Sequence, residues 1–323
     1  MRAYLIRRLL LIIPTVFIVT VLVFFIARFI PGDVIDMMVS EMSTIAEAQM
    51  AAEIDVDWIR HRLGLDVPIH VQYGRWAGKI FTHGDLGNSL WTQRPLIDEL
   101  RKRIPVTLEL SLLSLIISIV VALPIGVYSS IRQDTAGDYA GRTFAIAGMS
   151  IPNFWIGTMI VVLPAIWLGW SPSVVYIPLV EDPLGNLGQF IIPAVIMGMA
   201  TSAGLMRMTR TMMLEVLRND YIRTAWAKGL KERVIVLQHA LKNASLPLIT
   251  MLGARIPALL SGAIIMEQIF CLPGMGRLMI EAINNRDYPI ISGVNLIMAT
   301  LTLLCILATD ISYAWVDPRI RYR

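Results

Sequence analysis

The organisation of this chain is decided by the stretch Asp220–Thr250, DYIRTAWAKGLKERVIVLQHALKNASLPLIT. The stretch is basic and helix-forming, and it stands between two apolar runs. Asn219 or Asp220 can cap a short helix that begins at Tyr221, and Gly229 has the place of the residue after the helix end, where φ turns positive. The pattern therefore predicts a helix, a sharp corner and a second helix.

The second helix is expected from Lys231, with an apolar face. Its apolar residues recur at three- and four-residue steps, namely Val234, Leu237, Leu241 and Ala244. A short helix at a sharp corner protrudes, and a protrusion can dock into a cleft of another protein. An amphipathic linker lying on a membrane surface is the alternative that the pattern alone leaves open.

Composition indicates a membrane protein. Of the 323 residues, 56% are hydrophobic and only 16% are charged, whereas soluble domains carry roughly 25% charged residues. A helix needs about 20 apolar residues to cross the hydrocarbon core, so long uncharged runs mark the spans. Six spans are expected, at about Leu9–Ala27, Pro105–Tyr128, Thr143–Leu168, Gln189–Met206, Ala244–Phe270 and Pro289–Trp315.

The first span and the third have features of their own. Basic residues precede Leu9–Ala27, which is too long for a signal-peptide core and has no cleavage site after it, so we expect a retained span. The third span contains Pro152 and Pro164, which are expected to kink it.

The loops predict the orientation. Gly169–Gln189 has no Lys or Arg and carries Glu181 and Asp182, so it is expected outside. Residues 207–246 hold eight Lys or Arg against three Asp or Glu, a balance of +5. By the positive-inside rule this segment and both termini are expected in the cytoplasm. Residues 31–104 are expected to form a polar external insertion, with a helix at about Ile45–Leu63 and a turn at Gly84–Gly87.

Several classes of site are absent from the sequence. Cys271 and Cys305 are the two cysteines and are not expected to form a disulfide. We find no Cys/His metal spacing and no GxxxxGK[ST] loop, so no metal or nucleotide cofactor is expected in this chain. The basic residues indicate orientation and not a nucleic-acid partner. If ATP drives this protein, another chain binds it.

Two motifs in the central stretch carry a resemblance. DYIRTAWAKGL followed by HALKNASLP resembles the cytoplasmic loop of permease subunits of ABC importers, in the oligopeptide/dipeptide/nickel branch. Further matches follow in order along the chain: IPGD at Ile30–Asp33, HGDLG at His83–Gly87, TLEL at Thr107–Leu110, RMTR at Arg207–Arg210, LPGMGR at Leu272–Arg277, RDYP at Arg286–Pro289 and DPRIR at Asp317–Arg321.

The chain also departs from the family pattern. The family's glutamate-alanine-alanine opening is here Arg223, Thr224 and Ala225, and Trp226 stands where the peptide branch usually has arginine. IPGD is followed by valine where proline is common. Arg255 occupies a typically uncharged position of the fifth span.

The resemblance implies an all-α polytopic membrane protein with six transmembrane helices, in the type I ABC importer transmembrane-domain fold. Residues 1–323 would be a single permease domain with an external insertion at 31–104 and a cytoplasmic coupling segment at 207–246. Such a subunit pairs with a second, homologous permease subunit in the inner membrane. Two cytosolic ATPase subunits bind ATP and magnesium, and an external solute-binding protein delivers the solute. The subunit itself is not an enzyme.

The resemblance also implies which residues meet the ATPase. The coupling residues are expected to be Arg223, Thr224, Ala225, Ala227, Lys228 and Gly229. Small residues would allow close approach, and the two cations would meet acidic groups of the ATPase. Simple solvation of these charges is the alternative for either cation.

Each ionisable group inside a span is expected to have a functional or structural role, because inserting it into the membrane costs about 2.5–3.5 kcal/mol on insertion scales. Arg255 and Glu267 are candidates for lining the translocation pathway, and pairing with a neighbouring span or subunit is the alternative. Asp310 is expected to be an interfacial or structural partner. Ala254, Ala258 and Gly262 recur at four-residue spacing and would let another helix approach closely.

The leading functional hypothesis is the translocation subunit of an ATP-driven importer for small peptides. Oligosaccharides, glutathione-like compounds and nickel are the other solutes considered, although the four scattered histidines do not favour nickel. A stand-alone secondary transporter would need internal inverted repeats, which we do not see. A membrane-embedded enzyme would need a nucleophile or metal constellation in its spans, which is not evident.

Overall fold

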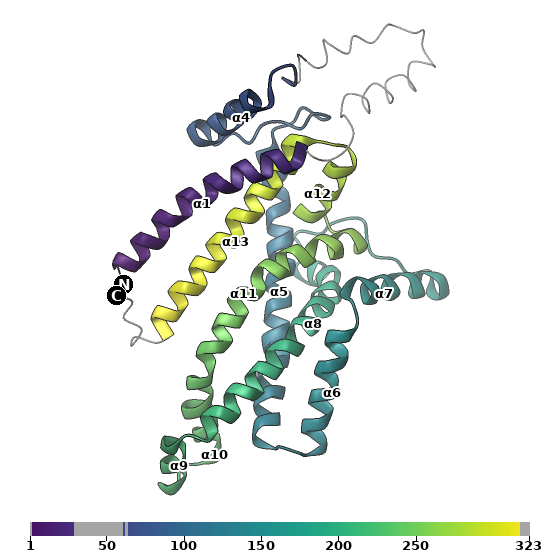
Figure 1. The fold of residues 1–323 in the computed structure, drawn as a ribbon. Helices are drawn as coiled ribbons and strands as arrows, with labels where there is room; N and C mark the ends of the chain where they lie inside the picture. The colour runs from purple at the N-terminus through teal and green to yellow at the C-terminus, as the bar shows by residue number, and fades with distance from the viewer. Residues whose placement is uncertain (1, 29–60, 62–63, 317–323) are drawn as a thin grey trace. The chain divides into compact units, whose positions relative to one another are not determined.

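The computed structural model describes residues 2–28, 61 and 64–316, and for 2–9, 310 and 312–316 it describes the backbone alone. The predicted helix at Ile45–Leu63 therefore falls almost wholly outside the described residues, as do the IPGD and DPRIR motifs. The described helices, in chain order, are α1 (Arg2–Arg28), α4 (Ile69–His83), α5 (Leu96–Ile131), α6 (Ala136–Ser150), α7 (Asn153–Leu168), α8 (Pro183–Leu217), α9 (Asp220–Ala227), α10 (Glu232–Val234), the π-helix η1 (Ile235–Ala240), α11 (Leu241–Ile269), α12 (Met275–Asn284) and α13 (Tyr288–Val316) (Figure 1).

The expected spans are present as helices. Within the described residues, five helical stretches are long and apolar enough to cross a membrane, and the pair α6 and α7 brings the number to as many as six. The third predicted span is not one straight helix, because α6 and α7 meet at 85°. Pro152 has no N–H to donate and forces Ile151 into an extended conformation, with φ −102° and ψ 124°. Pro164 lies inside α7 without ending it.

Two helices extend beyond the apolar runs that predicted them. α5 begins at Leu96, upstream of the expected Pro105, and α8 extends past both ends of Gln189–Met206. Asp182 caps α8 by accepting hydrogen bonds from the backbone N–H groups of the residues two and three positions on. Hydropathy marks the apolar part of a helix, whereas a cap marks its end.

The chain divides into two compact units. Unit 1 comprises residues 1–6, 106–273 and 302–323, and unit 2 comprises residues 7–105 and 274–301. In unit 1, α8 packs against α6 and α11. α5 also comes very close to α8, because a Cβ added at Gly198 would lie 2.8 Å from the Ser114 carbonyl oxygen. The absence of a side chain at Gly198 thus sets the distance between two apolar helices.

A buried carboxylate joins α6 to α8 in unit 1. Asp138 is fully buried and accepts from Arg142 one turn later, at 3.1 and 2.5 Å. It also accepts two hydrogen bonds from Arg210 of the RMTR motif, at 3.0 and 3.1 Å. Two guanidinium groups on one carboxylate compensate for its loss of water.

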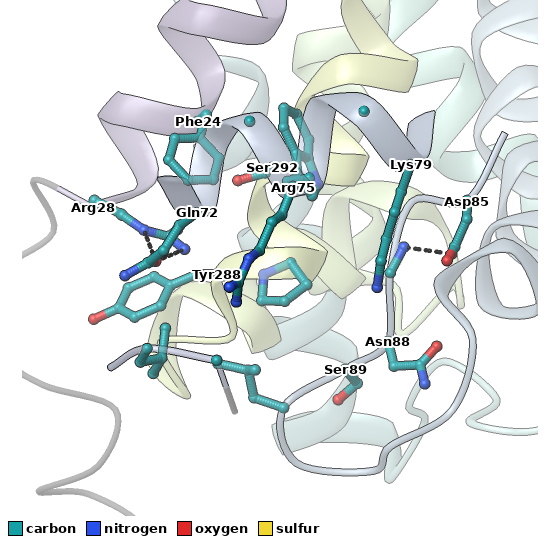
Figure 2. Close-up of a pocket in the computed structure, with 18 of the residues that line it drawn as sticks. Phe24, Arg28, Gln72, Arg75, Lys79, Asp85, Asn88, Ser89, Tyr288 and Ser292 are labelled. Atoms are coloured by element: carbon teal, nitrogen blue, oxygen red, sulfur yellow. Dashed lines mark hydrogen bonds between the residues drawn. The ribbon is translucent and has the colours of Figure 1, made fainter. Parts of the chain in front are cut away.

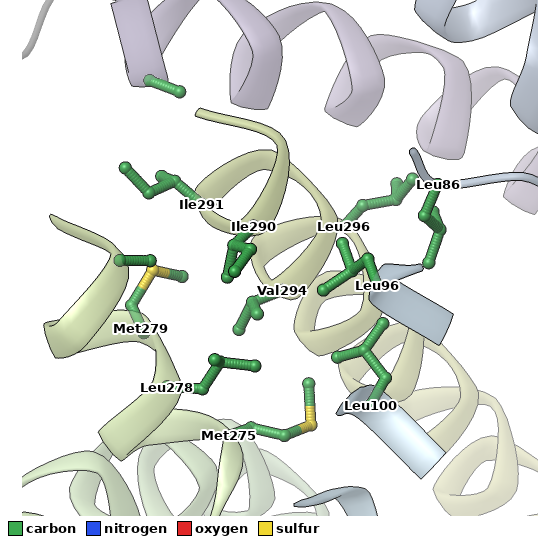
Figure 3. Close-up of a cluster of buried hydrophobic side chains, with 12 residues drawn as sticks. Leu86, Leu96, Leu100, Met275, Leu278, Met279, Ile290, Ile291, Val294 and Leu296 are labelled. Carbon is green, nitrogen blue, oxygen red and sulfur yellow. The ribbon is translucent and has the colours of Figure 1, made fainter. Parts of the chain in front are cut away.

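Unit 2 has its own apolar core, drawn in Figure 3. Leu86, Leu96 and Leu100 meet side chains from α12 and the start of α13, including Leu278 and Val294. The turn predicted at Gly84–Gly87 is present, with positive φ at both glycines. These apolar contacts place the loop that follows α4 against α13.

A second buried carboxylate holds the same loop in unit 2. The Ser89 hydroxyl donates to Asp287 Oδ2 at 2.5 Å, and the Leu90 N–H donates to its Oδ1 at 3.2 Å. Burial raises the pKa of Asp287, and these hydrogen bonds oppose that rise. The segment after HGDLG is thereby tied to the RDYP motif.

We expect Asp138→Ala to lower the free energy of unfolding by about 3 kcal/mol, because it leaves two arginines without their shared partner. Thermal unfolding of the detergent-solubilised protein would measure the loss. Asp134→Asn is the control, because the Asp134 side chain is 76% exposed and its ion pair with Arg142 is 3.7 Å long; it should change the stability by less than about 1 kcal/mol. Equal losses in the two variants would contradict a structural role for the buried carboxylate.

Candidate functional site

The predicted helix and corner are present as α9 and Gly229. Asn219 is the N-cap residue, and Asp220 places a negative charge in the first turn. Gly229 has φ +74°, its N–H bonds to the Trp226 carbonyl at 2.9 Å, and the Leu230 N–H bonds to the carbonyl five residues earlier at 3.3 Å. This is a Schellman ending, in which glycine tolerates the left-handed conformation that other residues resist.

One residue of the expected apolar face of the second helix is not buried among the described residues. Leu237 is 45% exposed, although the three- and four-residue steps place it on the same face as Val234, Leu241 and Ala244. The reason is that residues 235–240 form a π-helix, in which hydrogen bonds run from i to i+5 and the side chains are displaced around the axis. The side chains that are buried instead are those of Ile235, Val236, Ala240 and Ala244.

The inner side of α9 is anchored in an apolar cluster. Ile222 is fully buried and Ala225 nearly so. They belong to one cluster with Met213 of α8 and with the buried residues of η1 and α11. This group, which we call the α9 anchor, consists of Met213, Ile222, Ala225, Ile235, Val236, Ala240 and Ala244. It connects the corner to two of the apolar helices.

Polar contacts add to the α9 anchor. Asn243 of the HALKNASLP motif donates to the Tyr221 hydroxyl of the DYIRTAWAKGL motif at 2.8 Å. Arg132, at the end of α5, lies 3.6 Å from Glu232 of α10, with both side chains largely exposed. The first contact joins the two motifs that carried the family resemblance. The second is a surface ion pair, which contributes little to stability.

The outer side of the corner is exposed. Of the residues predicted to contact an ATPase, Arg223, Thr224, Ala227, Lys228 and Gly229 are exposed, whereas Ala225 faces the chain's own α9 anchor. Arg223 lies 3.6 Å from Asp220, and both side chains are mostly in solvent. The coupling role of these residues stays a prediction.

Trp226 and Leu230 belong to the same surface, and sequence reasoning did not include them. Trp226 is 48% exposed and Leu230 is 38% exposed. Both are large apolar residues that lie off the helical spacing of the buried residues, and this feature of the sequence could have identified them. The corner therefore presents apolar area between two cations, a composition typical of contact surfaces.

The two candidates for lining a pathway have different surroundings. Arg255 is exposed on α11, and its guanidinium lies 3.3 Å from where a Cβ of Gly204 would stand. Glu267 is fully buried and accepts a hydrogen bond of 2.6 Å from the Thr107 hydroxyl of α5. This bond joins α11 to the TLEL motif of a neighbouring span. The structure does not bring Arg255 and Glu267 together, and their pathway role stays a prediction.

The stripe of small residues lies on α11. Ala254 and Ala258 are exposed, and Gly262 is partly buried beside Met197 of α8. Asp310 lies within α13, and its side chain is not among those described. The interfacial or structural role of these four residues stays a prediction. In the described part of the chain, no group of three or more His, Cys, Asp or Glu side chains could hold a metal ion.

Comparison with known proteins places this architecture in a family. Residues 122–322 match the family described as "Binding-protein-dependent transport system inner membrane component", and residues 1–111 match the N-terminal family of such membrane components. The di/tripeptide transport system permease protein DppB of Pseudomonas aeruginosa (strain UCBPP-PA14) is 38% identical over 343 residues, covering 100% of both chains. The oligopeptide transport system permease protein AppB of Bacillus subtilis (strain 168) is 38% identical over 325 residues, again covering 100% of both.

A solved structure supports the fold independently. The inward-facing MetNI methionine ABC transporter matches with a TM-score of 0.54 and 19% identity, over 68% of this chain and 97% of that chain. At this identity the likeness shows the fold alone, which is that of an ABC importer membrane chain. The expected all-α fold and the family resemblance are both confirmed. The chain is a multi-pass permease subunit and belongs to the family of binding-protein-dependent transport system inner membrane components.

Proposed function

We propose that this permease subunit forms half of the translocation path for small peptides and is driven through its α9 corner by a cytosolic ATPase. One observation carries the proposal: an exposed short helix is fixed by the fully buried Ile222 to two apolar helices. A corner that was only a surface linker would not need such an anchor. A partner that moves α9 would move α8 and α11 with it.

The proposed assembly is the one that the family resemblance implies. A second permease subunit completes the path, two cytosolic ATPases bind ATP and magnesium, and an external solute-binding protein delivers the solute. Residues 207–246 and both termini face the cytoplasm, and residues 31–104 face outside. This chain makes and breaks no covalent bond. Its work is to change between two packings whose balance the ATPases shift.

The proposed solute is a small peptide. The two relatives described above are named for di/tripeptide and oligopeptide transport, and both align along the whole chain. Oligosaccharides, glutathione-like compounds and nickel are the other solutes that an uptake panel must include. Mass spectrometry of what the co-purified solute-binding protein carries would separate them.

We expect Gly229→Arg to abolish peptide uptake by the assembled transporter and to uncouple ATP hydrolysis, while the protein still inserts. A Cβ added at Gly229 would meet no atom of the described residues within 4 Å, so the defect would arise at the surface that a partner covers, together with strain at φ +74°. Gly169→Arg is a matched control, because Gly169 also has open space and φ +65°. Unimpaired uptake by the Gly229 variant would refute the docking role.

We expect Ile222→Ala to loosen α9, because a truncated buried isoleucine loses at least about 2 kcal/mol. That loss corresponds to roughly thirtyfold faster exchange of the α9 backbone amides. Hydrogen exchange followed by mass spectrometry would measure it. Thr224→Ala, on the exposed side of α9, is the control and should exchange as the wild type does. If both variants exchange alike, the α9 anchor does not fix the helix.

We expect Arg255→Ala to change the preference among solutes of different charge. An exposed cation in an apolar helix is costly unless it faces water or a partner, so Arg255 is proposed to face the path. Competition of labelled tripeptide uptake by acidic, neutral and basic tripeptides would show the change. Arg94→Ala, in an exposed loop of unit 2, should leave the preference as it is. An unchanged preference in the Arg255 variant would remove this residue from the path.

A further inference from the structure

Unit 2 contains a cavity of about 800 Å³ that the α9 corner does not use. Its walls come from the end of α1, from α4, from the loop that follows α4 and from the start of α13 (Figure 2). This volume lies within the range of small-molecule sites. Aromatic side chains form part of the lining, among them Phe24, Trp76 and Tyr288.

Two cations of α4 point into the cavity. Arg75 and Lys79 are four residues apart and therefore lie on one face of the helix. Figure 2 shows both side chains extending from α4 toward the loop that contains Asn88 and Ser89. With the described residues, neither side chain makes an ion pair or a hydrogen bond. Like charges at this spacing destabilise a helix unless an anion offsets them.

A third cation is held rigidly at the same cavity. The Arg28 guanidinium donates to Gln72 Oε1 at 3.2 and 2.8 Å. It also lies over the rings of Phe24, at 4.2 Å, and Tyr288, at 5.1 Å. No carboxylate among the described residues pairs with it. Among the described residues, its geometry is thus set by neutral groups.

The acidic groups near the cavity do not balance these cations. Asp85 lines the wall, and its Oδ1 accepts from the Gly87 N–H at 2.8 Å. Asp66 is engaged with His61 at 2.8 Å, and this hydrogen bond lowers the pKa of Asp66. The charge of Arg75 also lowers the pKa of Asp66, so two described carboxylates, Asp66 and Asp85, lie near the three cations Arg28, Arg75 and Lys79.

Two buried donors at the cavity lack acceptors. Ser292 is 1% exposed, and its hydroxyl has no hydrogen-bond partner in the described structure. The indole N–H of Trp76 is also buried without a partner among the described residues. Both residues line the cavity. A buried polar group left unsatisfied costs about 1–3 kcal/mol. Both donor atoms have almost no accessible surface, so they would reach an acceptor in the cavity only if the wall shifted.

We propose that this cavity binds the carboxylate end of a small solute. Three cations line a space that has aromatic walls, and a carboxylate supplies both the negative charge and the acceptor oxygens for their N–H groups. The solute class is a short peptide with a free C-terminus, with its carboxylate toward Arg75 and Lys79 and its apolar part toward Phe24 and Trp76. This inference rests on the proposed peptide transport and deepens it.

The test uses the full chain, assembled with its partner subunits, in nanodiscs of phosphatidylcholine. Trialanine and trialanine amide, which lacks the carboxylate, are titrated by calorimetry. The wild type should bind trialanine at least tenfold more tightly than the amide. The double variant R75Q/K79Q should weaken trialanine binding at least tenfold and leave amide binding unchanged.

The control is the double variant R101Q/K102Q, which removes two exposed cations of α5 that do not line the cavity. It should bind trialanine as the wild type does. Equal affinity for acid and amide, or equal weakening in both double variants, would overturn the proposal. The proposal would also be overturned if the R75Q/K79Q variant lost only co-purified phosphatidylglycerol, because the cavity would then hold a lipid headgroup.

Uptake of labelled trialanine separates this inference from the function on which it rests. If the wild-type transporter takes up trialanine and R75Q/K79Q binds it normally, peptide transport stands and the carboxylate site falls. If the wild-type transporter neither binds nor takes up peptides of any length, the proposed solute itself is wrong.

Discussion

The buried contact of Ile222 with the α9 anchor is the interaction on which the corner at α9 depends. A helix of eight residues is too short to be stable in water by its own hydrogen bonds. Its persistence at an exposed corner requires tertiary packing, and that packing comes from side chains of α8, η1 and α11. The same contact that keeps α9 folded is therefore the one able to pass a displacement to the membrane helices.

Buried carboxylates tie together segments that the sequence presents as separate motifs. Asp138 accepts from Arg210 of RMTR, Glu267 accepts from Thr107 of TLEL, and Asp287 of RDYP accepts from the segment after HGDLG. In each case one acid is removed from water and is satisfied by donors from another helix or loop. Such contacts are directional, and they specify which helix faces which neighbour in a protein whose membrane helices are mostly apolar.

Unit 2 differs from unit 1 in the balance of charge at its polar site. The acids of unit 1 described above are matched by donors of the chain itself. In the cavity of unit 2 the excess is of cations and unpartnered donors, at Arg28, Arg75 and Ser292 among others. A matched buried charge indicates a structural role, whereas an unmatched group at a cavity indicates a ligand. This contrast separates the two kinds of polar site in one chain.

Much of the fold could be predicted from residues that are close together in the sequence. Apolar runs predicted the membrane-spanning helices because lipid leaves a polar backbone no partner except its own helix. The corner at Gly229 was predictable for a similar reason, since a helix ending in the left-handed region depends on only a few neighbouring residues. The bend at Pro152 was predicted as a kink, but its angle of 85° depends on packing against α8 and α11.

What only the tertiary structure decided is which side of each helix is buried and what meets it there. The π-helix that exposes Leu237, the inward position of Ala225 and the bond between Glu267 and Thr107 all depend on residues distant in the chain. The convergence of Arg28, Arg75 and Ser292 on one cavity has the same origin. The sequence by itself determined the class of protein and the place of the corner, because these follow from local hydrophobicity and backbone conformation. Side-chain partnership depends on contacts between helices, for which a single sequence contains no local signal.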